Sequence, residues 1–195
     1  WTDNEIKFNT VNKQYKASDY ENLIKFNQND ILDSLQKKID NFQPDIIFWS
    51  AVSSHIHGEG EYVNIQYGYD LISKIKSNSL FITGGIQATA NPEKILDEFK
   101  KIDFLIRGES ELVLKEIANS LENKETIKKI DGLAFKDKDG KIVMRKKQKI
   151  ISDMDLIPNY DYSLFDNQIF LRPYNGEVLR AVDYEMSRGC IFTCS

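Results

Sequence analysis

The sequence predicts an α/β fold, in which a doubly wound parallel sheet is covered by helices on both faces. Three short apolar runs, Ile46–Trp49, Leu80–Thr83 and Phe104–Ile106, alternate along the chain with helical patterns. Strands and helices in this order, with short connections, give a parallel sheet. The runs are continuous rather than alternating, as expected of strands that are covered on both faces. A Rossmann-like or flavodoxin-like architecture follows.

The first two helices are expected on either side of the first strand. One begins at Asn29 or Asp30, either of which could cap it, and ends before Pro44. The other follows the loop Ser50–Glu61. Their apolar residues recur at helical spacing and are Ile31, Leu32, Leu35, Ile39 and Phe42 in the first helix and Val63, Tyr67, Leu71 and Ile75 in the second.

Two more helices are expected after the second and third strands. Asn91 caps one of them and Pro92 opens it, because proline suits the first position of a helix. Ser110 caps the other. The apolar residues that they bury are Ile95, Leu96 and Phe99 in one and Val113, Leu114, Ile117, Ala118 and Leu121 in the other. The alternating run Ile6–Val11 is expected to add a further strand to the sheet.

The pattern divides the chain into three regions. Residues 1–130 form the doubly wound domain, which could lack a first strand that precedes Trp1. Residues 131–177 form a hairpin, signalled by Asp139-Gly140 between two apolar runs, and an irregular linker. Residues 178–195 begin another domain with the apolar run Leu179–Met186.

Composition excludes several classes of protein. The 195 residues carry 26 Lys and Arg against 30 Asp and Glu, a formal charge of −4. This sign argues against a nucleic-acid-binding scaffold, which needs an excess of basic side chains. The apolar runs are too short to span a bilayer, and no signal sequence opens the chain. We therefore expect a cytoplasmic protein with no membrane span.

The two cysteines, Cys190 and Cys194, lie in the last six residues. A disulfide framework would spread its cysteines along the chain. Because the chain also starts at Trp1 without a methionine, we expect it to be a piece of a longer protein.

Ligands of doubly wound sheets bind beyond the carboxyl ends of the strands. That rule selects the loops Ser50–Glu61, Gly84–Asn91 and Arg107–Ser110. Gly84 and Gly85 would let the backbone pass close to a bulky group, or would simply form a tight turn.

Side chains in these loops have two interpretations each. Gln87 and Thr89 could bind a ligand by hydrogen bonds or satisfy the loop backbone. Glu109 could touch a ligand or support the start of the helix. His55 and His57 could ligate a metal, although an ordinary polar loop explains them as well.

The strongest motif is the pair Cys190 and Cys194, which Arg188-Gly189 precedes. Their spacing matches the first two-thirds of a C-x3-C-x2-C motif, whose third cysteine would lie two places after Ser195. Three thiolates can hold three irons of a 4Fe–4S cluster and leave the fourth iron open. Free thiols or half of a zinc site are the alternatives.

Four segments precede this pair in an order typical of one family, and they are Gly84–Glu93, Arg107–Glu111, Ile130–Phe135 and Ile157-Pro158. From about Phe42 to Ser195 the chain resembles the radical SAM enzymes that carry an N-terminal cobalamin-binding domain. The resemblance implies a Rossmann-like cobalamin domain, a hairpin and linker, and the first strand of a radical SAM barrel. It also implies a 4Fe–4S cluster that binds S-adenosylmethionine and generates a 5′-deoxyadenosyl radical.

The resemblance implies methyl transfer to an unactivated carbon, or a related radical cyclisation, by the longer protein on a small-molecule substrate. The chain alone would be inactive. The cofactor residues that we expect are Ser50, Ser53, Ser54, His55, Gly84, Gly85, Gln87, Thr89, Arg107, Gly108 and Glu109 for cobalamin, and Cys190 and Cys194 for the cluster.

One departure from the family concerns cobalt. Many cobalamin-binding domains carry Asp-x-His-x-x-Gly, whose histidine ligates cobalt, and this sequence has no such motif. We therefore expect His55 near the corrin ring without ligating it. The absence also favours a second interpretation, a docking or dimerisation module of the same fold that has lost cobalamin.

Overall fold

The computed structural model describes residues 19–25, 29–50 and 62–182. The chain divides into two compact units, one of residues 29–158 and one that joins residues 1–28 to residues 159–195. The expected strand Ile6–Val11 lies outside the described residues. Each unit is treated by itself.

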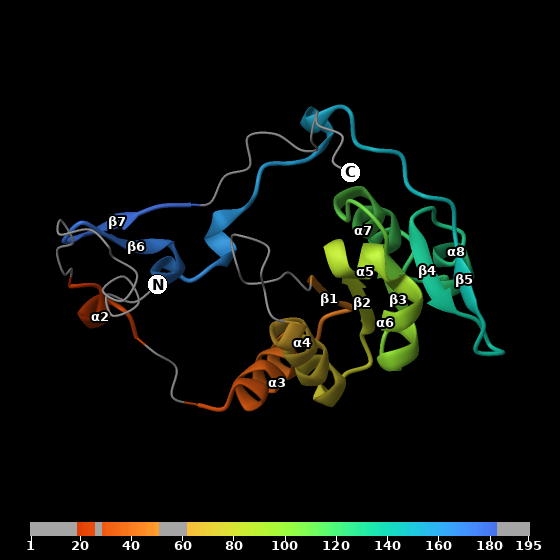
Figure 1. The fold of residues 1–195 in the computed structure, drawn as a ribbon, viewed down its shortest axis with the longest axis horizontal. Coiled ribbons are helices and arrows are strands. Elements are labelled where there is room, and N and C mark those ends of the chain that lie inside the picture. Colours follow the sequence, from red (N-terminus) through yellow and green to blue (C-terminus); the bar gives the residue numbers. More distant parts are fainter. Residues whose placement is uncertain (1–18, 26–28, 51–61, 183–195) are drawn as a thin grey trace. The chain divides into compact units, whose positions relative to one another are not determined.

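The larger unit is built on a five-stranded sheet (Figure 1). Its strands are β1 (Ile46–Ser50), β2 (Leu80–Gly84), β3 (Phe104–Ile106), β4 (Leu133–Lys136) and β5 (Ile142–Met144), in the order β1-β2-β3-β4-β5. The first three strands run parallel, whereas β4 is antiparallel to β3 and β5 to β4. The α/β class and the three parallel strands are confirmed, but the sheet is mixed rather than wholly parallel.

The expected hairpin forms and extends this sheet. Leu133 and Phe135 of β4 pack on one face of the sheet, and Ala134 packs on the other. All three side chains are buried. A strand that is apolar on both faces needs cover on both faces, and the position beside β3 supplies it. The hairpin therefore completes the sheet before the linker begins.

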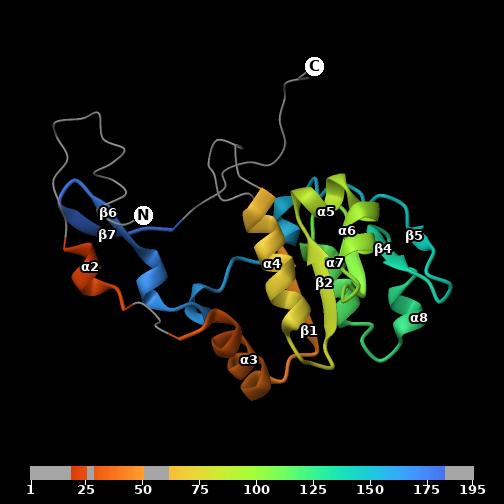
Figure 2. The same ribbon diagram turned by 60° about the horizontal axis from the view of Figure 1, so that its bottom comes forward.

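Helices cover both faces of the sheet, as the sequence predicts (Figure 2). They are α3 (Ile31–Phe42), α4 (Tyr62–Lys74), α5 (Ile86–Ala90), α6 (Pro92–Glu98), α7 (Glu111–Ala118) and α8 (Lys124–Ile127). The carboxylate of Asp30 caps α3 and accepts hydrogen bonds from the backbone N–H groups of Leu32 and Asp33. Asn91 and Ser110 occupy the N-cap positions of α6 and α7, but neither side chain makes a capping hydrogen bond. The short helices α5 and α8 were not expected.

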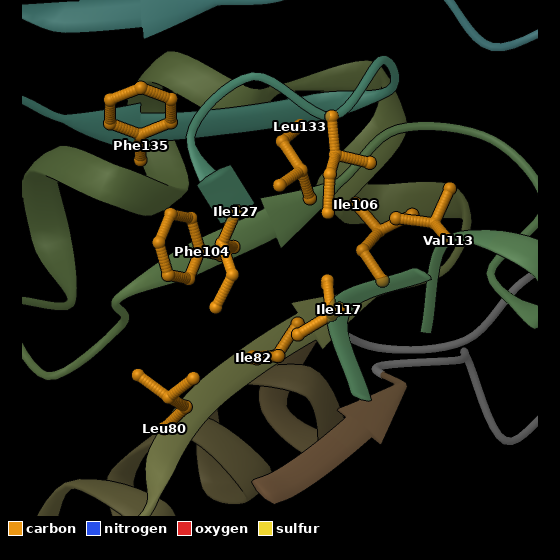
Figure 3. Close-up of a cluster of buried hydrophobic side chains, with 10 residues drawn as sticks. Leu80, Ile82, Phe104, Ile106, Val113, Ile117, Ile127, Leu133 and Phe135 are labelled. Atoms are coloured by element: carbon orange, nitrogen blue, oxygen red, sulfur yellow. The ribbon is translucent and has the colours of Figure 1, made fainter. Parts of the chain in front are cut away.

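The core is built around β2 and β3, whose residues are all buried. On one face the inward side chains of these strands and of β4 pack against α7 and α8, and Figure 3 shows this cluster. On the other face Phe81 packs with α3 and α4, and Leu105 with α4 and α6. The strand β1, expected to be buried on both faces, is only half-buried, because it lies at an edge of the described sheet.

The smaller unit contains a second hairpin, β6 (Leu171–Tyr174) and β7 (Glu177–Arg180). Asn175 and Gly176 connect these strands with φ angles of 46° and 85°, as a tight two-residue hairpin turn requires. The helix α2 (Tyr20–Leu23) contacts β6. The backbone N–H and carbonyl of Lys25 both bond the side-chain amide of Gln168.

Short 3-10 helices occupy the linker, at Met154–Leu156, Tyr162–Leu164 and Asn167–Phe170. Each starts after an aspartate whose carboxylate accepts a backbone N–H of the turn. In the described part of the chain, no helix is both long and apolar enough to cross a bilayer.

A substitution at Ile82 tests the core between the sheet and α7, because Ile82 of β2 is fully buried in this cluster. We expect Ile82→Val to lower the free energy of unfolding by about 0.5–1.5 kcal/mol and Ile82→Ala by about 2–5 kcal/mol. Urea denaturation followed by circular dichroism measures both. Equal and small losses in the two variants would contradict the packing described.

Candidate functional site

The parallel strands β1, β2 and β3 end at the same edge of the sheet, where the predicted loops begin. Ser50 and Gly84, the last residues of β1 and β2, are partners in the sheet register. The described candidates at this edge are Ser50, Gly84, Gly85, Gln87, Thr89, Arg107, Gly108 and Glu109. The candidates Ser53, Ser54, His55, Cys190 and Cys194 lie outside the described residues, as does His57.

Gly84 is a glycine because of its neighbours in the protein. A Cβ atom at this position would lie 2.9 Å from the hydroxyl oxygen of Ser110 and 3.1 Å from the ring of Phe48. The first distance is shorter than real Cβ contacts. The sequence left a ligand or a tight turn as explanations, and the structure adds a third, which is packing between β1 and the start of α7. Neither Phe48 nor Ser110 was singled out as a contact of this glycine.

The backbone conformation at residue 85 requires a glycine. Its φ of 94° lies in the region that L-residues rarely adopt. It is the N-cap residue of α5, and its carbonyl accepts the backbone N–H of Thr89 at 3.0 Å. The turn exposes 74% of the next side chain, Ile86. An exposed apolar group next to a glycine turn gives this edge a small apolar surface.

A hydrogen bond ties the loops that follow β2 and β3 together. The backbone N–H of Gly108 donates to the hydroxyl oxygen of Thr89 at 2.9 Å. Gly108 has a φ of 99° and open space around it, so the conformation and not crowding demands glycine. A threonine hydroxyl that accepts one hydrogen bond still has a proton to donate. Thr89 can therefore hold the two loops together and bind a ligand at the same time.

Arg107 and Glu109 bond the chain that follows the hairpin. The guanidinium Nη2 of Arg107 donates to the carbonyl of Arg145. A carboxylate oxygen of Glu109 accepts the backbone N–H of Ile151 at 3.0 Å. Of the two roles that the sequence left open for Glu109, these bonds favour support of the structure.

Trp49 is a polar group at this edge that sequence reasoning missed. Its indole Nε1–H is buried and has no hydrogen-bond partner among the described residues. The ring packs edge-on against Tyr69, with centroids 5.7 Å apart. A buried donor without a partner costs free energy, and an acceptor that reached this N–H would remove that cost. The position at the end of a strand was the only signal in the sequence.

The chemistry of this edge suits a large ligand with both apolar and polar parts. It combines glycine turns, the exposed Ile86, the hydroxyls of Ser50 and Thr89, and the indole N–H of Trp49. Cobalamin is such a ligand, and these residues fit it. Among the described residues, no group of three or more His, Cys, Asp or Glu side chains could hold a metal ion.

No family model matches the chain. It is 32% identical over 167 residues to an anaerobic magnesium-protoporphyrin IX monomethyl ester cyclase of Cereibacter sphaeroides, a match that covers 84% of this chain and 26% of that protein. It is 29% identical over 160 residues to an uncharacterized methyltransferase of Pyrococcus horikoshii, covering 82% of this chain and 32% of that protein. The chain therefore spans about a third or less of these relatives.

Solved structures give a more distant likeness. The radical S-adenosylmethionine methyltransferase TsrM from Kitasatospora setae, solved with cobalamin and a [4Fe-4S] cluster bound, is 15% identical to the chain. The match covers 69% of this chain and 24% of TsrM, with a TM-score of 0.49.

Gly84→Ala tests the packing at the site. We expect a loss of about 1–3 kcal/mol in the free energy of unfolding, because the new methyl group must displace Ser110 or Phe48. The matched control is Gly68→Ala in α4, where nothing lies within 4 Å of the added Cβ. Alanine favours a helix over glycine, so this variant should gain about 0.5–1 kcal/mol. Losses of equal size in the two variants, measured by urea denaturation, would show that Gly84 is not specially constrained.

Proposed function

We infer that this chain belongs to the family of cobalamin-binding radical SAM enzymes. From that premise, we propose that it is the cobalamin-binding region of such an enzyme. Its relatives bear the names of a cyclase and of methyltransferases. The longer protein would accordingly catalyse methyl transfer to an unactivated carbon of a small molecule, or a related radical cyclisation. We expect it in the cytoplasm, and the chain alone to be inactive.

The observation that carries the proposal is the hydrogen bond between Gly108 and Thr89 at the carboxyl edge. It holds two glycine-containing loops side by side at the place where doubly wound sheets bind their ligands. Ser50 ends the neighbouring strand at the same edge. The proposal extends to the candidates outside the described residues, Ser53, Ser54 and His55.

The residues of this chain would hold and orient the cofactor rather than carry out the reaction. Thr89 and Trp49 would donate hydrogen bonds, and Ile86 would cover apolar surface and exclude water. Bound cobalamin would supply the methyl group, or the cobalt chemistry of a cyclase, and the cluster with S-adenosylmethionine would supply the radical.

For the domain organisation we propose a cobalamin domain followed by a linker and by the first strand of a radical SAM barrel near residue 178. Residues 1–130 and 131–177 are the limits that the sequence predicts for the first two parts. Because β4 and β5 pair with the cobalamin-domain sheet, the hairpin would belong structurally to the first part.

The second candidate function is a docking or dimerisation module. Within the described sheet β1 is a half-buried edge strand, and this favours the docking function, because an edge strand can pair with another chain. The absence of an Asp-x-His-x-x-Gly motif agrees with it. A measurement of cobalamin binding distinguishes the docking module from the cobalamin-binding region.

Ser50→Trp tests the cofactor site. Ser50 is exposed at the carboxyl edge, and an indole there should fill the space for the cofactor. We expect the longer protein to retain hydroxocobalamin after desalting, as the visible spectrum would show, and the variant to bind it at least about tenfold more weakly, about 1.4 kcal/mol.

The matched control is Asn78→Trp, an exposed position just before β2 at the opposite edge of the sheet. It should bind hydroxocobalamin like the unchanged protein. Circular dichroism checks that both variants fold. No retained corrin absorbance in the unchanged protein would contradict the cofactor proposal and leave the docking module.

Cys190→Ala and Cys194→Ala test the cluster. After anaerobic reconstitution of the longer protein with iron and sulfide, each variant should lose most of the bound iron, because three thiolates are needed to hold the cluster. Iron and sulfide analysis measures the loss. A residue other than cysteine two places after Ser195, or full iron content in both variants, would remove the cluster from the proposal.

A further inference from the structure

The chain that leaves the β4–β5 hairpin is hydrogen-bonded to the loop between β3 and α7, residues 107–110. We name residues 145–151 the exit segment. It continues the β4–β5 ladder with two hydrogen bonds, from the N–H of Arg145 to the carbonyl of Leu133 at 2.8 Å and from the N–H of Gly132 to the carbonyl of Lys146 at 2.7 Å. It ends at Ile151, whose side chain is only 8% exposed. The exit segment is therefore anchored at both ends.

Gly132 allows the close approach of the exit segment. Its φ is 87°, and a Cβ there would lie 3.4 Å from the Cβ of Gln148 and 3.5 Å from a methyl group of Val113. The middle of the exit segment thus lies against Gly132, just before β4, and the same glycine lies beside Val113 of α7. Packing of this kind fixes the path of a segment that has no regular secondary structure.

The β3–α7 loop, residues 107–110, bonds in two directions. Toward the candidate site, the N–H of Gly108 bonds Thr89. Toward the exit segment, Arg107 bonds the carbonyl of Arg145, and Glu109 bonds the N–H of Ile151. Consecutive residues of one short loop therefore connect the loop after β2, which contains Thr89, with the chain that continues to residues 159–195.

Glu109 makes the most distant of these connections, to a backbone group 42 residues later in the chain. The acceptor in this bond is the carboxylate of Glu109, and hydrogen bonds to charged groups are stronger than those between neutral groups. Ile151 cannot replace that bond by moving into water without also exposing its buried side chain. The bond and the burial therefore stabilise the same position of the exit segment.

We propose that Glu109 is a positioning residue that holds the exit segment to the β3–α7 loop and so couples the cofactor loops to the chain that leads toward Cys190. The coupling to a ligand rests on the proposed function. If a ligand orders the β3–α7 loop through Thr89 and Gly108, it must also steady the exit segment, and the influence is reciprocal.

Limited digestion with trypsin tests the positioning role, because Lys146, Lys147 and Lys149 lie in the exit segment and are exposed. In Glu109→Ala the exit segment should be cleaved about tenfold faster than in the unchanged chain, since loss of a hydrogen bond to a charged group raises the population of the open segment. Mass spectrometry of the fragments assigns each cleavage.

Glu109→Gln is the matched variant, because its amide oxygen can accept the same N–H, and it should restore slow cleavage. Lys138 and Lys141, in the exposed β4–β5 turn, provide the internal control and should be cleaved at the same rate in all three proteins. Equal cleavage of the exit segment in the unchanged chain and in Glu109→Ala would overturn the proposal. Rapid cleavage in Glu109→Gln like that in Glu109→Ala would also overturn it.

Digestion of the longer protein with and without hydroxocobalamin tests the coupling. Hydroxocobalamin should slow cleavage of the exit segment in the unchanged protein and have little effect in Glu109→Ala. Binding without any change in cleavage would overturn the coupling. No binding at all would overturn the proposed function and the coupling with it, whereas the comparison of variants without ligand would still decide the positioning role.

Discussion

Burial of β2 and β3 on both faces is the constraint on which the rest of the structure depends. Every residue of these strands is buried, including the polar Thr83, whose hydroxyl bonds Tyr69 and the carbonyl of Trp49. Two helical layers are needed to cover such strands. With both faces covered, ligands can reach the backbone of the central strands only where the strands end.

Local patterns made most of the larger unit predictable. The helix from Ile31 to Phe42 follows from its apolar spacing and from Asp30, whose capping bonds involve residues two and three places away. The place of the hairpin was harder to predict. Asp139-Gly140 indicates a turn, but which strand the hairpin joins depends on the apolar surface that β3 leaves uncovered, far away in the sequence.

At the site, the sequence predicted that the loops after β2 and β3 lie at the same edge of the sheet, and the bond between Gly108 and Thr89 joins them. It did not predict how each side chain is used. The pairing of Ser50 with Gly84 follows from the parallel order of the strands. Glu109, in contrast, bonds a backbone group 42 residues away, and the sequence contains no local sign of this partner. The crowding of Gly84 by Phe48 and Ser110 is equally a product of tertiary packing.

These hydrogen bonds indicate different roles for the loops at this edge. Arg107 and Glu109 bond the exit segment, and the N–H of Gly108 bonds Thr89, so the β3–α7 loop already uses much of its hydrogen-bonding capacity within the protein. A ligand would then be held chiefly from the ends of β1 and β2, where Ser50 and Ile86 are exposed. The proposed ligand contacts and the bonds to the exit segment would then lie on neighbouring loops, which the hydrogen bond between Gly108 and Thr89 joins.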